Sequence, residues 1–303
     1  MFPMPHARWI AAPQATARIA ARLERALAPP ADTYVPWSVD GRVVGWITQR
    51  RALRLEAWSD VFVRGVDGIE LAPSLARAEE RTRALERVAR ALAAENALTA
   101  WRDERYAVSA SCGRPPLFEL ERAAARFFGI HTHAAHANGL VRDAGGWRMW
   151  LARRSPSKAI DPGLLDNLVG GGIAAGSDAR STLTREAFEE AGIPAELAER
   201  ADAAGRVEIR RDQPDGLQRE TIHVYDLWLP RDFVPSNQDG EAVEHRLCAP
   251  DATFSILASD DITADASLVI VDFLLRHGHI ATDDPSLPTL DALRRAQAGP
   301  RDE

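Results

Sequence analysis

Residues 171–193 read GGIAAGSDARSTLTREAFEEAGI and carry three glutamates on one predicted helix, directly after a glycine-rich loop. Successive helical residues are turned by about 100°, so the three carboxylates fall within an arc of roughly 100°. They are Glu186, Glu189 and Glu190. The opposite side of the same helix is predicted to be buried and holds Thr184, Ala187, Phe188 and Ala191. One helix therefore combines an acidic face with an apolar face.

This acidic face predicts a metal site. Like charges three or four residues apart repel by about 0.2–0.5 kcal/mol per pair, so the helix gains nothing from the cluster alone. A hard divalent cation would convert that repulsion into coordination, because carboxylate oxygens are its preferred ligands. The alternative is a solvated helix face, where glutamate usually lies. We expect Mg2+ or Mn2+ because glycines and an arginine flank the glutamates in register.

The same stretch resembles the signature box of the Nudix hydrolases. That box reads Gly, five residues, Glu, seven residues, Arg-Glu, an apolar residue, any residue, Glu-Glu, any residue, Gly and an apolar residue. Gly171 opens the match, and Gly192 with Ile193 closes it. The sequence departs at one position, where Ser177 with Asp178 beside it replaces the family's first glutamate. Both are good helix caps, and the alternative is that Asp178 reaches toward the metal.

Segments outside the box narrow the resemblance to one subgroup. They are ERAAARFFGI (121–130), HANGLV (136–141), WLARRSPSK (150–158), PGLLDNLVGGGI (162–173) and VDFLLRHG (271–278). The subgroup carries an uncharacterised N-terminal domain and is similar to the Nudix part of fungal thiamine pyrophosphokinases. The resemblance implies an α+β protein, with a Nudix α/β/α sandwich around a mixed sheet and a smaller α+β domain before it.

The resemblance also implies roles for individual residues. Expected metal ligands are the carboxylates of Glu186 and Glu190, Glu189 as a further ligand or base, and the backbone carbonyl of Gly170. Arg185 is expected to orient one of the glutamates. Glu244, in the late segment NQDGEAVEHRL (237–247), is expected to assist metal or water, with Glu241 as a second carboxylate nearby. The expected phosphate contacts are Arg153, Arg154 and Lys158. The alternative for these last residues is ordinary surface charge.

The implied activity is Mg2+-dependent hydrolysis of a diphosphate linkage in a small molecule. In this branch the implied substrates are thiamine diphosphate and its oxidised analogues, cleaved to the monophosphate. A Nudix hydrolase of nucleoside diphosphate derivatives such as ADP-ribose, NADH, coenzyme A or oxidised nucleotides is an alternative. Another is a ligand sensor of the same fold without turnover, which the change at Ser177 suggests and the intact glutamates oppose.

Composition limits the partners. The chain has 303 residues, 46% hydrophobic and 27% charged, with a net charge of −7, which argues against a dedicated nucleic-acid binder. It has no apolar run of about 18 residues, so we expect no membrane span.

Cys112 and Cys248 lack metal-site spacing, which favours a reducing cytoplasm. The alanine- and arginine-rich start resembles a transit peptide or, more simply, an amphipathic helix. The oligomeric state is left open, a homodimer included.

Periodicity predicts two domains and a tail, at residues 1–130, 131–285 and 286–303. In the first we expect a hairpin turned at Asp40-Gly41, a helix over 74–96 and a second helix over 117–128. In the second we expect strands over 147–153, 206–210 and 221–229 and a helix over 266–277. The tail is predicted to be partly helical and expendable.

Three histidines, His131, His133 and His136, lie close together, but no cysteine or carboxylate set accompanies them as a zinc site requires. We expect them to shape a strand or the substrate pocket. Trp147, Trp150 and Trp228 are able to stack on a substrate ring, although core packing is the simpler role.

Overall fold

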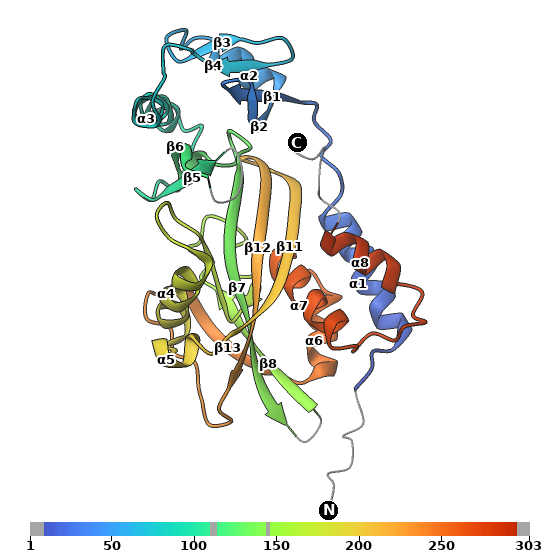
Figure 1. The fold of residues 1–303 in the computed structure, drawn as a ribbon. Coiled ribbons are helices and arrows are strands. Elements are labelled where there is room, and N and C mark those ends of the chain that lie inside the picture. Colours follow the sequence, from blue (N-terminus) through green and yellow to red (C-terminus); the bar gives the residue numbers. More distant parts are fainter. Residues whose placement is uncertain (1–8, 110–113, 144–145, 296–303) are drawn as a thin grey trace, which may run out of the picture.

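The computed structural model describes residues 9–109, 114–143 and 146–295 (Figure 1). Its N-terminal elements are β1 (Tyr34–Val39), β2 (Arg42–Thr48), α2 (Gln49–Leu55), β3 (Phe62–Arg64), β4 (Ile69–Leu71), α3 (Ala78–Ala94), β5 (Arg105–Ser109) and β6 (Pro116–Glu121). The first four strands form a sheet in the order β2-β1-β4-β3, and β5 pairs with β6. Their core includes Trp37, Phe62, Phe118 and Phe128. This part is a small α+β unit, as expected.

The hairpin predicted at Asp40-Gly41 is confirmed. Val39 pairs with Arg42 in an antiparallel ladder, leaving two residues in the turn. Both have positive φ, 51° for Asp40 and 72° for Gly41, as the tight hairpin turn requires. The helix expected over 74–96 is also present as α3, with Leu85, Val88 and Leu92 buried.

The helix predicted over 117–128 is wrong. Residues 116–121 form β6, and only the short 3-10 helix η1 (Arg122–Ala124) follows before Gly129. Phe118 and Leu120 alternate with more exposed neighbours and pair opposite Val108 and Tyr106 of β5. The apolar residues of this segment fit a helical period as well as the period of two of a strand. Pairing with β5 stabilises the strand.

A mixed seven-stranded sheet organises the second part of the chain. Its main path runs β11 (Asp202–Gln213), β12 (Gly216–Leu229), β7 (His131–Asp143), β8 (Gly146–Arg154) and β13 (Ala242–Cys248). The short strands β9 (Leu165–Asn167) and β10 (Val169–Gly172) pair with β8 and β7 respectively. β12 and β7 are parallel, whereas the other pairs are antiparallel. The strands predicted in this region are confirmed, and β11 and β12 are longer than predicted.

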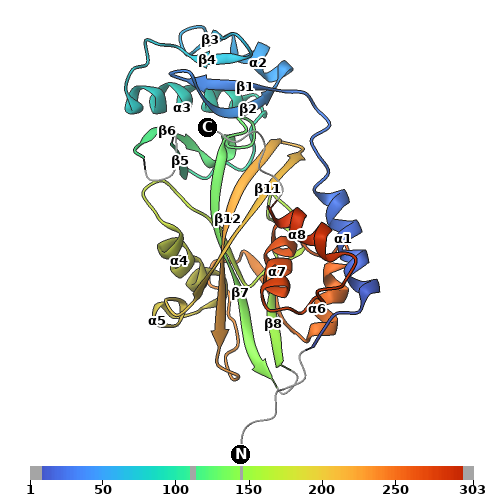
Figure 2. The same ribbon diagram turned by 45° about the vertical axis from the view of Figure 1, so that its right-hand side comes forward.

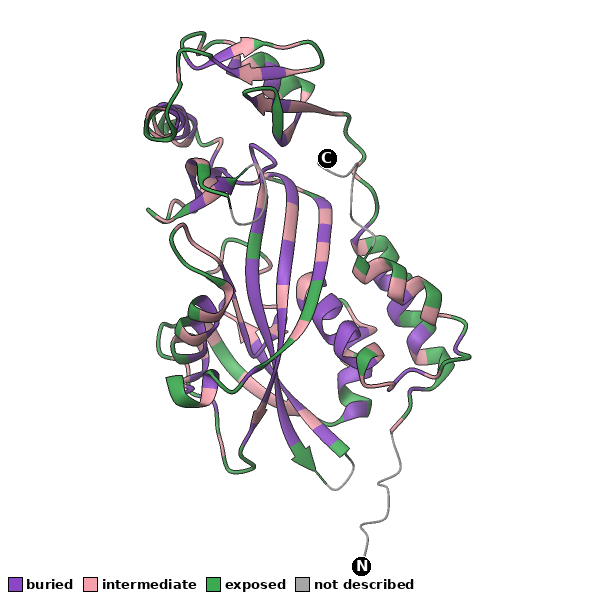
Figure 3. Cartoon of the chain, in the orientation of Figure 1, coloured by how far each residue is buried: buried purple, intermediate pink, exposed green. Residues whose placement is uncertain are grey.

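Helices cover both faces of this sheet. α4 (Ala179–Ala191) and α5 (Ala195–Ala198) lie on one face, and α6 (Pro250–Leu257) and α7 (Ala264–Arg276) lie on the other (Figures 1 and 2). The small N-terminal unit lies at one end of the long strands. Figure 3 shows the central strands buried along most of their length. This is the α/β/α sandwich with a smaller α+β unit before it that the sequence resemblance implies.

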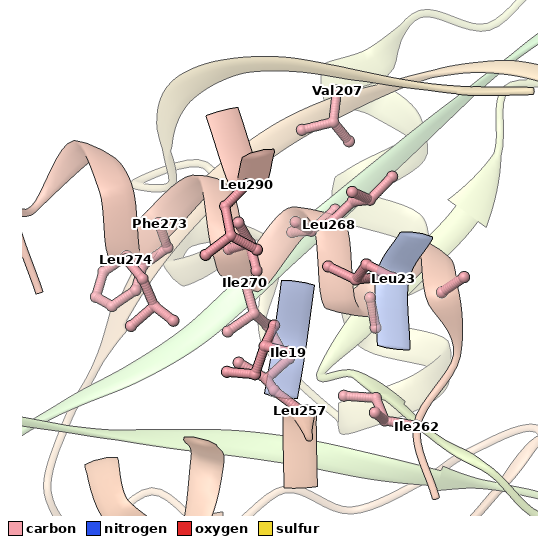
Figure 4. Close-up of a cluster of buried hydrophobic side chains, with 14 of the residues drawn as sticks. Ile19, Leu23, Val207, Leu257, Ile262, Leu268, Ile270, Phe273, Leu274 and Leu290 are labelled. Atoms are coloured by element: carbon pink, nitrogen blue, oxygen red, sulfur yellow. The ribbon is translucent and has the colours of Figure 1, made fainter. Parts of the chain in front are cut away.

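The first and last helices pack on the sandwich. α1 (Pro13–Ala26) places Ile19 and Leu23 against Leu257 and Ile270, and α8 (Leu287–Arg295) adds Leu290 to the same cluster (Figure 4). The predicted expendable tail is therefore corrected: Leu290 is fully buried, and Arg294 donates to the buried Asp272. An apolar stripe on a short helix does not reveal its distant partner. The domain limits at residues 130 and 285 stay a prediction.

Among the described residues, no helix is both long and apolar enough to cross a membrane.

Candidate active site

Helix α4 begins and ends where its sequence dictates. Asp178 is the N-cap: its carboxylate accepts from the backbone N–H of Ser181 at 2.7 Å, and the Ser181 hydroxyl accepts from the Asp178 N–H at 3.1 Å. Gly192 ends the helix in the left-handed conformation, with φ 64°. Ser177 is exposed just outside the cap. Capping therefore accounts for Asp178, and its carboxylate is committed to the start of the helix.

The two faces of α4 are present, with one correction. Leu183, Ala187 and Ala191 are fully buried against the sheet. Phe188, predicted to be buried with them, is 56% exposed. It lies about 100° around the helix from Ala187, beyond the contact with the sheet. Glu186 is only 8% exposed, so the buried face borders the acidic one directly.

The glutamates meet the edge of β10. The Glu190 carboxylate accepts from the backbone N–H of Gly170 at 2.8 Å. A Cβ at Gly171 would lie 2.2 Å from Glu186 Oε1, so the Glu186 side chain packs directly on the glycine and would have to move for any larger residue. The glycine-rich strand and the acidic helix thus form one unit.

Two of these carboxylates have a raised pKa. Burial raises the pKa of Glu190 to about 8, and the negative charge of Glu186 adds to the rise. Burial also raises the pKa of Glu186. A divalent cation between them would stabilise their ionised forms. The donor chemistry therefore fits the expected metal.

Gly170 supplies a third oxygen on the same side. In an antiparallel ladder the N–H and C=O of one residue point to the same edge, and the Gly170 N–H points to Glu190. Among the described residues, no three His, Cys, Asp or Glu side chains converge as a ready-made metal cluster. Two carboxylates and a carbonyl nevertheless match the way Mg2+ is usually held, since it keeps waters and substrate phosphates as its other ligands.

Arg185 contacts two of the three glutamates. Its guanidinium donates to Glu186 and to Glu189, each at 2.8 Å. The predicted orienting role of Arg185 agrees with these contacts. Glu189 is half-buried and lies farther from β10 than its neighbours in the helical projection, so it is the less direct of the three carboxylates.

A cavity of about 490 Å³ runs along this edge, within the size range of small-molecule sites. Gly170, Gly171 and Gly172 line it, together with Arg154 and Lys158. Arg154 donates to Asp166 at 2.7 Å, and Lys158 pairs with Glu241. Two of the three cations predicted for phosphate contact therefore lie in the cavity wall.

Arg153 and Glu244 do not line this cavity, and neither do Arg185 and the three glutamates of α4, so the roles predicted for Arg153 and Glu244 stay a prediction. Arg153 pairs with Glu244 at 3.1 Å and with Asp261 at 2.8 Å. Successive strand residues point to opposite faces, so Arg153 lies on the side of Leu151 and α7, away from Arg154. Likewise His245, beside Glu244, reaches the Glu190 carbonyl at 3.1 Å, which leaves Glu244 on the far face. Of the two late carboxylates, Glu241 is the one paired with cavity cations.

Sequence analysis missed several cavity residues. Asp166 lies three residues before the start of β10 at Val169, but only the fold places it near Arg154 and Glu190. Others come from the N-terminal part of the chain, which no local motif connects to the box. They are Arg102, Tyr106, Arg122 and Arg126.

The histidines and tryptophans play minor parts. His136 lines the cavity and its Nδ1 lies 2.9 Å from Asn167 Oδ1, which agrees with the predicted role in shaping the pocket. The rings of His131 and His133 stack at 5.1 Å. Trp147 and Trp150 are buried in the core. Cys112 lies outside the described residues, and Cys248 is buried.

Comparisons with known proteins agree with the geometry. Residues 132–268 match the NUDIX domain, and residues 17–132 match a domain of unknown function (DUF4743). Nudix hydrolase 24, chloroplastic, of Arabidopsis thaliana is 37% identical over 88% of this chain and 73% of its own length. Nudix hydrolase 20, chloroplastic, of the same plant is 38% identical over 82% and 69%. An uncharacterized Saccharomyces cerevisiae protein, YJR142W, is 29% identical over 83% and 79%. The chain therefore belongs to the Nudix hydrolase family, whose members act on pyrophosphate bonds, and carries an N-terminal domain of unknown function before its NUDIX domain.

Proposed function

We propose that this protein is a Mg2+-dependent hydrolase of a small-molecule diphosphate, with thiamine diphosphate or its oxidised analogues as substrate and a monophosphate as product. One observation carries the proposal: the Glu190 carboxylate accepts from the Gly170 N–H and Glu186 packs on Gly171, in a strand that lines a cavity of suitable size. Mn2+ would serve the same donors.

Glu186, Glu190 and the Gly170 carbonyl would hold the cation, which when bound would neutralise phosphate charge and lower the pKa of a water. Arg185 keeps the carboxylates of Glu186 and Glu189 oriented. Arg154 and Lys158 bind the diphosphate from the loop side. A carboxylate of the set, Glu189 or Glu190, accepts the proton of the attacking water.

The lining of the cavity supports a substrate with a cationic or donor-rich ring. Four carboxylates line the cavity besides Asp166: Asp161, Asp215, Glu220 and Asp265. They would attract a positively charged heterocycle such as a thiazolium, whereas the cations near Gly170 would attract its diphosphate. A nucleoside diphosphate derivative is the alternative substrate class.

A phosphate-release panel with Mg2+ tests the proposal. It compares thiamine diphosphate, its oxidised analogues, ADP-ribose, NADH, coenzyme A and nucleoside triphosphates. We expect the largest kcat/KM on the thiamine group. Preference for ADP-ribose or NADH would move the substrate to the alternative class, and no turnover on any compound would favour a non-catalytic sensor.

The predictions of a cytoplasmic location and of no nucleic-acid or membrane partner remain part of this proposal. They rest on the net charge of −7 and on the cysteine pattern. Light scattering of the purified protein would show whether it is a homodimer.

A further inference from the structure

The N-terminal domain forms one wall of the cavity. Residues Thr99, Arg102, Tyr106, Arg122 and Arg126 all line it. Tyr106 lies directly on the glycine strand, because a Cβ at Gly172 would be 2.2 Å from its hydroxyl oxygen. The backbone N–H of Ala175, in the loop from β10 to α4, donates to the Arg105 carbonyl at 2.7 Å. The β5–β6 strand pair thus contacts the end of β10 and the loop that follows it.

Arg122 is the cation of this wall that lies beside Tyr106. It follows β6 directly, at the start of η1. The guanidinium lies 5.9 Å from the Tyr106 ring centre and donates to Glu104 at 2.7 Å. Its guanidinium therefore lies beside the tyrosine that contacts the glycine strand.

Cations line the cavity on two sides. Arg154 and Lys158 come from the NUDIX domain, and Arg102 and Arg122 come from the N-terminal domain. Glu241 links the sides, since it accepts from Arg102 at 3.1 Å and pairs with Lys158. A diphosphate carries charge on both phosphoryl groups, so cations on both sides match it better than one side alone.

We propose that Arg122 of the N-terminal domain is a substrate-binding residue, whose planar guanidinium holds the diphosphate against the edge formed by Gly170–Gly172. The active site is then built from both domains, and the domain of unknown function contributes recognition. The inference rests on the proposed function, because it takes a diphosphate as the ligand. An ion pair with Glu104 leaves further guanidinium N–H groups able to donate to phosphate oxygens.

The test uses methylenediphosphonate, a diphosphate analogue that water cannot cleave, titrated calorimetrically with Mg2+ into the full chain. Arg122→Gln should weaken binding at least tenfold and raise KM more than it lowers kcat. Arg54→Gln is the matched control: its side chain is 37% exposed, like that of Arg122, and it pairs with one glutamate, Glu95, outside the cavity. This control should bind as the wild type does.

Glu104→Gln separates binding from folding, because it breaks the same ion pair and keeps the arginine. It should bind the analogue at least as tightly as the wild type. Equal losses in Glu104→Gln and Arg122→Gln would assign Arg122 a structural role and overturn the inference, as would wild-type binding in Arg122→Gln. If Arg122→Gln binds the analogue as the wild type does and the wild type cleaves a diphosphate, only this inference fails. If the wild type binds the analogue through Arg122 but cleaves no diphosphate, the proposed function fails and the binding site stands. A wild type that does not bind the analogue overturns the inference.

Discussion

The proposed metal site depends most on Glu190. It accepts from Gly170, lies near the charge of Glu186, and has its pKa raised to about 8, first by burial. These features describe a group that is costly to ionise alone and favourable to ionise beside a cation. The sequence predicted this residue and Glu186 because their spacing on a helix follows from its periodicity.

Glu190→Gln should lower Mg2+-dependent kcat by roughly a hundredfold or more, since a ligand or base is lost while the side chain keeps its shape. The free energy of unfolding at pH 7 without metal should stay about the same, because a carboxyl with a pKa of about 8 is mostly neutral there and glutamine still accepts from the Gly170 N–H. Glu196→Gln, on the short helix α5, is the control and should keep wild-type activity. Equal kcat in the wild type and Glu190→Gln would show that the metal is placed wrongly.

His131 gives a pH-dependent contribution to stability. Burial lowers its pKa to about 4, and the charge of His133 adds to the effect. An unfolded histidine titrates near pH 6.5, so as the pH falls from about 6.5 to 4 the unfolded state binds the proton first and stability is lost.

Between pH 6.5 and 4, the free energy of unfolding should fall by about 1–3 kcal/mol less in His131→Gln than in the wild type. Urea unfolding at pH 7, 5.5 and 4 measures it. The same pH slope in the variant and the wild type would contradict the neutral, buried histidine.

Arg153, Glu244 and Arg122 show what sequence alone does not decide at this scale. Arg153 and Arg154 are equivalent in the sequence, and only the strand register decides which one faces the cavity. β13 also has an irregular register between Ala242 and Glu244, which local periodicity does not reveal. Arg122 lies 49 residues before Gly171, where the box begins, so only the tertiary fold brings it to the cavity.

At the scale of elements, short-range signals determine α4 and long-range pairing determines β6. Asp178 and Gly192 fix the ends of α4 through contacts with residues three to five positions away. Residues 117–121 have an apolar pattern that suits a helix or a strand, and β5 selects the strand. The hairpin at Asp40-Gly41 was predictable because its turn chemistry is local.

Asp178→Ala should lower the free energy of unfolding by about 1 kcal/mol, because the N–H of Ser181 loses its acceptor. Ser177→Ala, one residue away and exposed, should change it by less than about 0.5 kcal/mol. Chemical denaturation compares the two. A larger loss in Ser177→Ala would move the cap to Ser177.

At the scale of the whole molecule, α1 and α8 complete the sandwich. They pack against α6 and α7 (Figure 1), and Leu290 lies in the shared core (Figure 4). The sheet and its helices were predictable in kind from the resemblance. Their partners were not, because a buried leucine does not indicate which distant surface buries it.

Leu290→Ala should destabilise the protein by about 2–5 kcal/mol, through lost burial and a cavity. Leu53→Ala, at a side chain that is 53% exposed, should cost much less. Equal, small effects would show that the C-terminal helix is dispensable, as its sequence suggests.

The central claim is that Glu186, Glu190 and Gly170 form the Mg2+ site of a diphosphate hydrolase. The direct measurement is Mg2+-dependent conversion of thiamine diphosphate and the other panel substrates to monophosphates, by the wild type and by Glu190→Gln in parallel. The account predicts turnover by the wild type that disappears with a metal chelator and falls at least about a hundredfold in the variant. Turnover that is unaffected by the chelator and by the substitution would contradict it.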